Sequence, residues 1–361
     1  GMVFRKARAR RMSKTNPGNF FEDFEVGQTI RHATPRTVTH GDVAVYASLY
    51  GARYAVTSSE PFAKSLGFGM APVDDFLVFH VVFGKTVPDI SLNAVANLGY
   101  AECVFHAPVY PGDTLAAESE VIGLKENSNG KTGVVYVRSK GFNQHGACVL
   151  SYARWVMVNK RDHGAPPPEP QVPDLAAAVG PSDFADATCG ISFGAYDFTL
   201  AGAGHRFGDY EVGERIDHAD GVTIEEAEHQ SATRLYQNTA KVHFNEFEQK
   251  ESRFGRRLIY GGVVISLARA LSFNGLENAQ RVLALNGGRH VAPTFAGDTI
   301  FAWSEILEKQ DIPTRNDCGA VRVRTFALKN QPSGSFAGTR EGKNHDPNVV
   351  LDLDYWVLLP R

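Results

Sequence analysis

Cysteine is scarce in this chain, and its charges nearly cancel. Four of the 361 residues are cysteines, and no two of them form a CxxC pair. This spacing gives no thiolate metal site and suits a reducing compartment, so we expect a cytoplasmic protein without a bound metal. The formal net charge of −3 argues against nucleic-acid binding, which relies on an excess of Lys and Arg to neutralise phosphates.

Long apolar runs are missing as well. The nearest approach to one is Phe76–Phe83, which His80 interrupts and which falls far short of the roughly 18 residues of a membrane span. We therefore expect no association with a membrane. No glycine-rich dinucleotide-binding or phosphate-binding pattern is present, so no nucleotide cofactor is expected. Hydrophobic residues still make up 43% of the chain, which is enough to build two cores.

The main positive feature of the sequence is an internal repeat. Phe21–Gly27 returns as Phe207–Gly213, and Leu49–Thr57 aligns without a gap with Leu235–His243, both at an offset of 186 residues. This period is far longer than that of a solenoid, so each unit is a domain of ordinary size and the chain derives from a duplication. Two further blocks return in the same order, namely Tyr110–Leu115 as Phe295–Ile300 and Arg154–Val156 as Tyr355–Val357.

The repeat divides the chain into four parts. Residues 1–18 are a basic leader without an apolar stretch, which we expect to be disordered rather than a secretory signal. Gly1 before Met2 is typical of an expression remnant, and Met12 is a candidate native start. The N-terminal domain spans 19–160 and the C-terminal domain 204–361. The linker, 161–203, is rich in Pro, Ala and Gly. It should lie over the surface, with one short helix near Leu175–Val179.

Each half contains one compact apolar stretch followed by strand-like runs. Helical spacing of apolar residues predicts one helix over Val73–Phe83 and another over Leu258–Phe273. A helix followed by an antiparallel meander predicts an α+β domain whose sheet curls around the helix. The predicted strands are Val134–Arg138, Val149–Val156, Thr299–Trp303, Val321–Thr325 and Val349–Leu353, with a turn at Asn127–Gly130.

The two halves differ in the residues able to do chemistry. The second half has Asn238 and His243 where the first has Ala52 and Thr57. An amide and an imidazole can hold and deprotonate a water molecule, whereas alanine and threonine cannot. The comparison therefore predicts one site, in the second half. Asn238 and His243 are five residues apart and would lie on different faces of a regular helix, so they can converge only if this segment is irregular.

This segment resembles a known signature. The MaoC-like double hot-dog proteins, which are (R)-specific enoyl-CoA hydratases and dehydratases, carry Gly-Asp-x-Asn-Pro-x-His and, farther along, His-Gly. Gln237–His243 followed by Tyr260-Gly261 fits that frame. His243 and Gly261 are kept, but Asn238 stands in place of Asp, and Ala, Lys and Tyr replace the family's Asn, Pro and second His.

A narrower resemblance covers nearly the whole chain after about residue 18. Asp74–Asn93, Gly99–Glu102, Leu124–Gly133 and Gln237–Phe244 are similar to the mesaconyl-CoA hydratases, also called β-methylmalyl-CoA dehydratases, a subfamily that carries the Asn variant. The resemblance implies a double hot-dog fold with an internal pseudo-dimer. It also implies reversible hydration of a branched dicarboxylic enoyl-CoA, with no cofactor beyond the coenzyme A of the substrate. Whole chains could associate further into a homodimer.

The residues can be matched to this chemistry. His243 would deprotonate the water that adds to C3. The Gly261 amide, at the start of a helix, would stabilise the enolate oxygen, whereas the first half has Asp75 there, which would repel an enolate. Asn238 would orient the water, and we hypothesise that it lacks a charge because the substrate brings its own carboxylate. The candidates for substrate binding are Lys241, Tyr260, Gly262, Arg256 and Arg257, with Arg234 and Arg253 nearby.

Other interpretations remain open at this stage. A single histidine before a helix can be structural, Asn238 can be a helix cap, and Gly261-Gly262 can serve close packing. The basic residues can form a solvated face. Two alternative functions also remain: a hydratase or thioesterase acting on another acyl-CoA, and a non-catalytic acyl-CoA-binding protein.

Overall fold

The computed structural model describes residues 13–341 and 344–361. Eleven strands form one antiparallel sheet in the order β1-β4-β5-β6-β3-β8-β11-β10-β9-β7, with β2 also paired to β4. The first half supplies β1 (Thr29–Arg31), β2 (Arg36–Thr37), β3 (Ala94–Phe105), β4 (Thr114–Glu126), β5 (Thr132–Phe142) and β6 (Cys148–Asn159). The second supplies β7 (Arg215–Thr223), β8 (Arg281–His290), β9 (Thr299–Asp311), β10 (Cys318–Lys329) and β11 (Val349–Pro360).

The order of the strands is a mirror of itself about the seam between β3 and β8. At that seam Tyr100 pairs with Gly288 and Val104 with Ala284, so the two halves join edge to edge and leave no unpaired edge in the middle of the molecule. All five predicted strand runs lie inside observed strands, β5, β6, β9, β10 and β11. The prediction of an α+β double hot-dog fold is confirmed.

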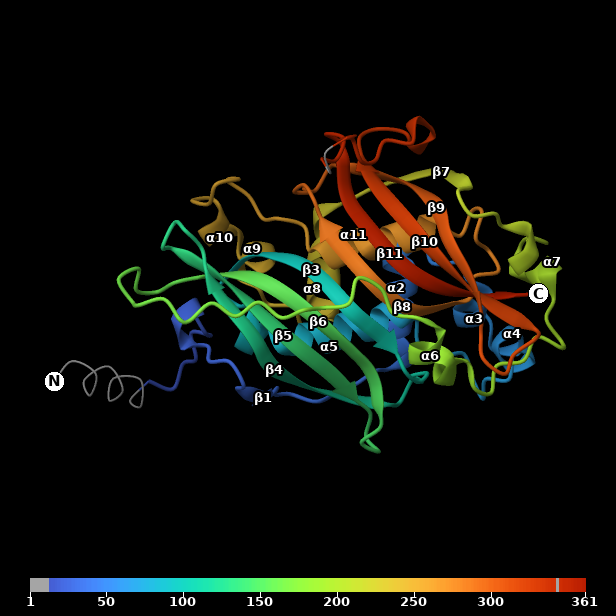
Figure 1. Cartoon of the computed structure of the whole chain (residues 1–361), viewed down its shortest axis with the longest axis horizontal. Coiled ribbons are helices and arrows are strands. Elements are labelled where there is room, and N and C mark those ends of the chain that lie inside the picture. The colour runs from blue at the N-terminus through green and yellow to red at the C-terminus, as the bar shows by residue number, and fades with distance from the viewer. Residues whose placement is uncertain (1–12, 342–343) are drawn as a thin grey trace.

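Each half of the sheet curls around one central helix (Figure 1). Helix α5 (Asp75–Ile90) packs against β4, β5 and β6, and helix α11 (Gly261–Leu271) packs against β7, β9, β10 and β11. Nearly every side chain of α5 is buried, which explains its almost continuous apolar sequence. Both predicted helices are present with different bounds. Helix α5 begins two residues later than predicted and continues seven residues past Phe83. Helix α11 begins three residues later and ends two residues earlier than predicted.

Shorter helices complete each half. Helices α2 (His40–Tyr50) and α8 (Glu226–Leu235) contact each other between the halves. Tyr50 and Tyr236 are equivalent in the repeat, and their hydroxyls bond to each other at 2.7 Å, as expected where a twofold pseudo-axis passes. The others are α3 (Ala55–Ser58), α4 (Glu60–Ser65), α6 (Pro181–Phe184), α7 (Phe198–Ala201), α9 (Lys241–Phe244) and α10 (Glu246–Gln249). Among the residues described, no helix is long and apolar enough to cross a membrane.

The chain between the halves is more ordered than the sequence suggests. The helix predicted at Leu175–Val179 is wrong, because the first helix here is α6, which begins at Pro181, a favourable first position for proline. Phe184 and Ile191 are buried in a second apolar cluster, so the segment does not simply lie over the surface. Of the predicted leader, residues 1–12 lie outside the described residues, and the rest forms neither helix nor strand.

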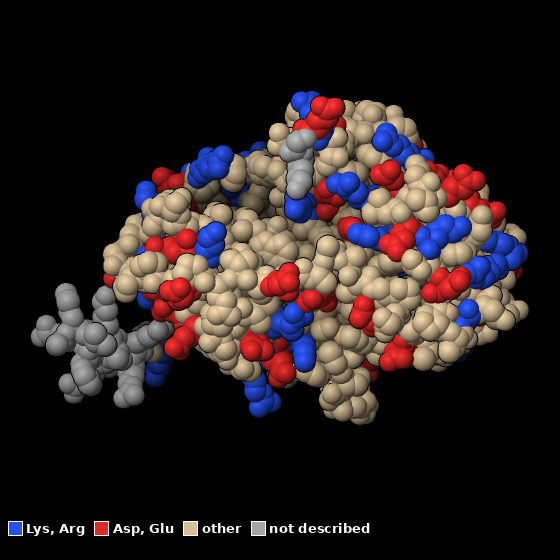
Figure 2. Space-filling model, viewed as in Figure 1, with Lys and Arg blue, Asp and Glu red and all other residues tan. Residues whose placement is uncertain are grey.

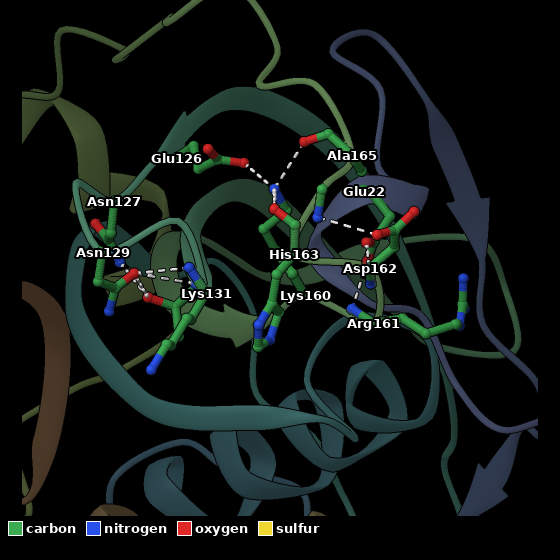
Figure 3. Close-up of polar contacts among 12 residues, drawn as sticks. Glu22, Glu126, Asn127, Asn129, Lys131, Lys160, Arg161, Asp162, His163 and Ala165 are labelled. Carbon is green, nitrogen blue, oxygen red and sulfur yellow. Dashed lines mark hydrogen bonds and ion pairs between the residues drawn. The ribbon is translucent and has the colours of Figure 1, made fainter.

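Polar contacts hold the start of this segment against the first half (Figure 3). The Lys160 ammonium pairs with Glu126 and donates to the Ala165 carbonyl at 2.9 Å. The two carboxylate oxygens of Glu22 accept from the backbone N–H groups of Arg161 and Asp162, each at 2.8 Å. Lys160 is 4% exposed, so its charge requires these partners. The segment therefore leaves the first domain along a defined path.

Candidate active site

One cavity of about 750 Å³ lies between the two halves and contains the predicted site. This volume suits a small acyl group together with part of its carrier. The first half contributes a wall that includes Phe83, Val87, Asn97, Tyr100 and Arg154. The second half contributes Asn238, Ala240, Lys241, His243, Arg253, Tyr260, Gly261 and His290, among others.

The segment that carries Asn238 and His243 is irregular, as predicted. Helix α8 ends at Leu235, Gln237 adopts a positive φ of 52°, and the short helix α9 begins at Lys241. The turn lets both side chains line the same cavity. Asn238 is 1% exposed, and its Oδ1 accepts a bond from the Ala240 N–H at 3.3 Å.

His243 is held in one tautomer. Its Nδ1 lies 2.8 Å from the Leu258 carbonyl oxygen, and because a carbonyl can only accept, Nδ1 carries the proton. Nε2 is then the basic nitrogen, and nothing among the described residues bonds to it. Burial lowers the pKa of His243 to about 4, although the Leu258 carbonyl opposes this shift. The ring is therefore neutral near neutral pH and can accept a proton.

Gly261 is the first residue of α11, and no side chain caps this helix end. The Gly261 N–H therefore has no intrahelical partner, and none appears among the described residues outside the helix. A Cβ at this position would lie 2.4 Å from Cε1 of His290, so only glycine lets that ring pack over the helix end. The arrangement places a free amide at the positive end of a helix inside the cavity.

The structure adds histidines and a tyrosine that sequence reasoning missed. The hydroxyl of Tyr100 lies 3.0 Å from Nε2 of His290, and Nε2 of His229 accepts from the Tyr260 N–H at 2.9 Å. Burial lowers the pKa of His290 to about 4 and that of His229 to about 3. The repeat held a signal for both, since their counterparts at offsets of 185 and 186 are apolar: Phe105 for His290 and Val43 for His229.

The predicted substrate-binding residues fall into two groups. Lys241 and Tyr260 line the cavity, as does Arg253. Gly262 packs against Tyr260 and His80 instead, with a Cβ there only 2.3 Å from the tyrosine ring.

The remaining two candidates lie outside the cavity wall. Arg257 pairs with Glu226 and Glu246, and Arg256 donates to the Ala296 carbonyl at 2.8 Å. Basic side chains gather at the edge of the molecule near α10 and the segment after it (Figure 2). A role for Arg256 and Arg257 in binding the substrate, at its carboxylate or at the coenzyme A phosphates, stays a prediction.

The first half has no equivalent chemistry at its own helix start. Thr57 donates its hydroxyl to the Tyr54 carbonyl, and Asp75 pairs with Arg281 at 2.7 Å. A buried carboxylate already paired with an arginine is not an oxyanion donor. Within residues 13–341 and 344–361, no group of His, Cys, Asp and Glu could hold a metal ion.

Comparisons with known proteins give a consistent result. The family model described as mesaconyl-CoA hydratase matches residues 2–178 and 232–345. A β-methylmalyl-CoA dehydratase of Chloroflexus aurantiacus is 63% identical over 97% of this chain and 99% of that protein. A mesaconyl-CoA hydratase of Cereibacter sphaeroides is 60% identical over 96% of this chain and 100% of that protein.

Solved structures agree with these sequence matches. A putative MaoC domain protein dehydratase of Chloroflexus aurantiacus superposes with a TM-score of 0.94 at 63% identity, covering 97% of this chain and 99% of that one. A Mycobacterium tuberculosis protein with a double hotdog fold superposes at 0.72 and 23% identity, covering 95% of this chain and 99% of that one. The second likeness supports the fold alone.

Proposed function

Because the chain belongs to the mesaconyl-CoA hydratase family, we propose that it adds water reversibly to mesaconyl-CoA to give β-methylmalyl-CoA, with His243 as the base. It is a hydro-lyase, and the coenzyme A it handles belongs to the substrate. The observation that carries the assignment of the base is the His243–Leu258 hydrogen bond, which fixes the tautomer and leaves Nε2 free in the cavity.

The proposed reaction uses three groups of the second half. Nε2 of His243 takes a proton from a water that Asn238 orients, and the hydroxide adds to C3 of the enoyl thioester. The electron pair moves to the thioester oxygen, where the Gly261 N–H stabilises the enolate. The imidazolium then returns a proton to C2, so that one water is added in net. Dehydration is the reverse sequence.

A cytoplasmic location and a homodimer belong to the same proposal. All four cysteines lie in the described part of the chain as free thiols, which supports a reducing compartment.

Both halves of one chain line the cavity, so the proposed homodimer is not required for the chemistry.

The test is a spectroscopic hydration assay with mesaconyl-, crotonyl- and itaconyl-CoA. His243→Ala should lower kcat on mesaconyl-CoA by about 10²–10⁴-fold, the usual contribution of a positioned base. His145→Ala is the matched control, since His145 is exposed at a turn outside the cavity. Full activity in His243→Ala would refute the role of this residue. Release of free thiol rather than water addition would indicate a thioesterase. A parent protein that binds the esters without turnover, and binds them equally well after His243→Ala, would indicate a binding module.

A further inference from the structure

Arg154, on the first-half side of the cavity, has a charge that no carboxylate balances. It is 1% exposed and lines the cavity from strand β6. No ion pair involves it within the described residues. Burial lowers the pKa of its guanidinium, and the neighbouring groups that oppose this shift are tyrosines rather than acids. A buried charge of this kind is costly unless a partner arrives.

The guanidinium is only partly satisfied by its neighbours. One terminal nitrogen, Nη2, donates to the hydroxyls of Thr86 and Ser91 at 2.9 and 3.1 Å. The other, Nη1, donates to the Asn97 Oδ1 at 3.3 Å, and the Phe83 ring covers one face at 4.1 Å. Nε of Arg154 and Nδ2 of Asn97 are both buried without a hydrogen-bond partner. Both residues line the cavity, and each leaves one donor, and no acceptor, without a partner.

The fold itself does not require an arginine here. In the repeat, the position equivalent to Arg154 is Tyr355, whose hydroxyl bonds to Thr325 at 2.8 Å inside the second half. A neutral side chain therefore serves the same strand position in the other domain. Elsewhere the protein pairs a buried arginine directly, as with Arg281 and Asp75 at 2.7 Å.

Arg154 lines the same cavity as His243 and is linked to it through two intervening aromatic rings. The Phe83 ring that stacks on its guanidinium lies 5.7 Å from the Tyr260 ring, and the Tyr260 ring lies 5.6 Å from that of His243. In a 2-methylbutenedioyl thioester the free carboxylate is bonded to C3, the carbon that takes the hydroxide. The carboxylate and the reacting carbon must therefore bind in the same cavity, whose wall includes Arg154 and Asn97.

We propose that Arg154, assisted by Asn97, binds the free carboxylate of the substrate and so selects dicarboxylic over monocarboxylic enoyl-CoA esters. This inference rests on the proposed function. The guanidinium is a planar donor suited to a carboxylate, and the bound anion supplies the counter-charge that Arg154 lacks among the described residues. Without that anion the donors stay unmatched, so an ester with a methyl group in this place is disfavoured.

The test compares Arg154→Gln and Arg154→Lys with the parent protein on two substrates. The pair is mesaconyl-CoA and tiglyl-CoA, which has a methyl group in place of the carboxylate. Arg154→Gln should lower kcat/KM for mesaconyl-CoA by about 100-fold or more while changing that for tiglyl-CoA by less than about fivefold. Arg154→Lys keeps the charge but loses the planar fork, and should retain part of the preference. Arg322→Gln is the control, because Arg322 pairs with Asp354 on the neighbouring strands and does not line the cavity.

Equal losses on both substrates would overturn the proposal, since they would mean that Arg154 only braces the end of α5 through Thr86 and Ser91. If Arg154→Gln does not fold, Arg154→Lys decides through the ratio of kcat/KM for mesaconyl-CoA to kcat/KM for tiglyl-CoA. A ratio equal to that of the parent protein counts against the proposal, and a lower ratio supports it. A parent protein that hydrates neither ester would contradict the proposed function instead. The role of Arg154 is then tested by the rise in melting temperature that each ester causes. A larger rise with mesaconyl-CoA than with tiglyl-CoA in the parent protein, lost in the variant, supports the role. Equal rises with both esters in the parent refute it.

Discussion

The acid side of the pH–rate profile tests the state of His243 directly. The base must be neutral to act, and burial places the pKa of His243 at about 4. Because the pKa is lowered, the active form persists to lower pH than for an ordinary histidine. At pH 5.5 an imidazole with a pKa of 6.5 would be about 9% neutral, whereas one with a pKa near 4 would be about 97% neutral. The two cases differ about tenfold in kcat/KM at that pH.

The assay follows the loss of enoyl-thioester absorbance between pH 5.5 and 7.5, at limiting mesaconyl-CoA for kcat/KM and at saturating mesaconyl-CoA for kcat. The expected result is a kcat/KM at pH 5.5 within about 20% of its value at pH 7, because kcat/KM reports the free enzyme. The profile of kcat should bend at a higher pH than that of kcat/KM, since a bound carboxylate near His243 favours its charged form. Circular dichroism at each pH shows whether the protein stays folded.

A fall in kcat/KM of about eightfold between pH 7 and 5.5, which an imidazole with a pKa of 6.5 would give, would refute the reasoning if the fold stays intact. It would mean either that the His243 ring is better solvated than its contacts indicate or that a different group is the base. A kcat profile as flat as that of kcat/KM over this range would show that the substrate carboxylate does not raise the pKa of His243 in the complex.

Three further substitutions test separate parts of the site. Asn238→Asp should lower kcat/KM for mesaconyl-CoA by about tenfold or more at neutral pH, because a second carboxylate repels the first; tighter binding or faster turnover would contradict this. Gly261→Ala should lower kcat by at least about tenfold, because its Cβ would fall 2.4 Å from Cε1 of His290 and displace the helix end that carries the amide; unchanged kinetics would show that the His290 ring accommodates the Cβ and would contradict this prediction. Asp75→Ala should cost about 3–5 kcal/mol in the free energy of urea unfolding, since Arg281 stays buried and unpaired; a loss below about 1 kcal/mol would show that water replaces the carboxylate.

The parts of the fold that sequence predicted are those with the strongest local patterns. The strands β5, β6, β9, β10 and β11 contain runs of β-branched and aromatic residues, which favour strands in any context. Strand β3 was missed, because Ala94–Phe105 mixes small and polar residues and is a strand only through its pairing with β6 and β8. The linker helix was misplaced, because the burial of Phe184 depends on contacts from distant segments.

The candidate site was predicted from differences between the two copies, and this comparison cannot find residues that the first copy contributes to a shared site. It identifies residues such as Asn238 and His243, where the second copy has gained polar groups at positions that are neutral in the first. It assumes that the site belongs to one copy. The cavity instead lies at the interface, so Asn97, Tyr100 and Arg154 enter it from the copy that was judged inactive. No spacing in a single half could show that.

With the proposed mechanism, the shared cavity also accounts for the retention of a first half that has no base or oxyanion donor of its own. At the start of α5, where a second site would stand by symmetry, the Asp75–Arg281 ion pair and the contact between Phe76 and Phe105 fill the space. With that end closed, the first half no longer needs a base or an oxyanion donor. Its strands β3 and β6 are free to shape the wall opposite His243, where the position matching Tyr355 carries Arg154. After the duplication, one copy could therefore specialise in activating water while the other specialised in recognising the group to which it is added.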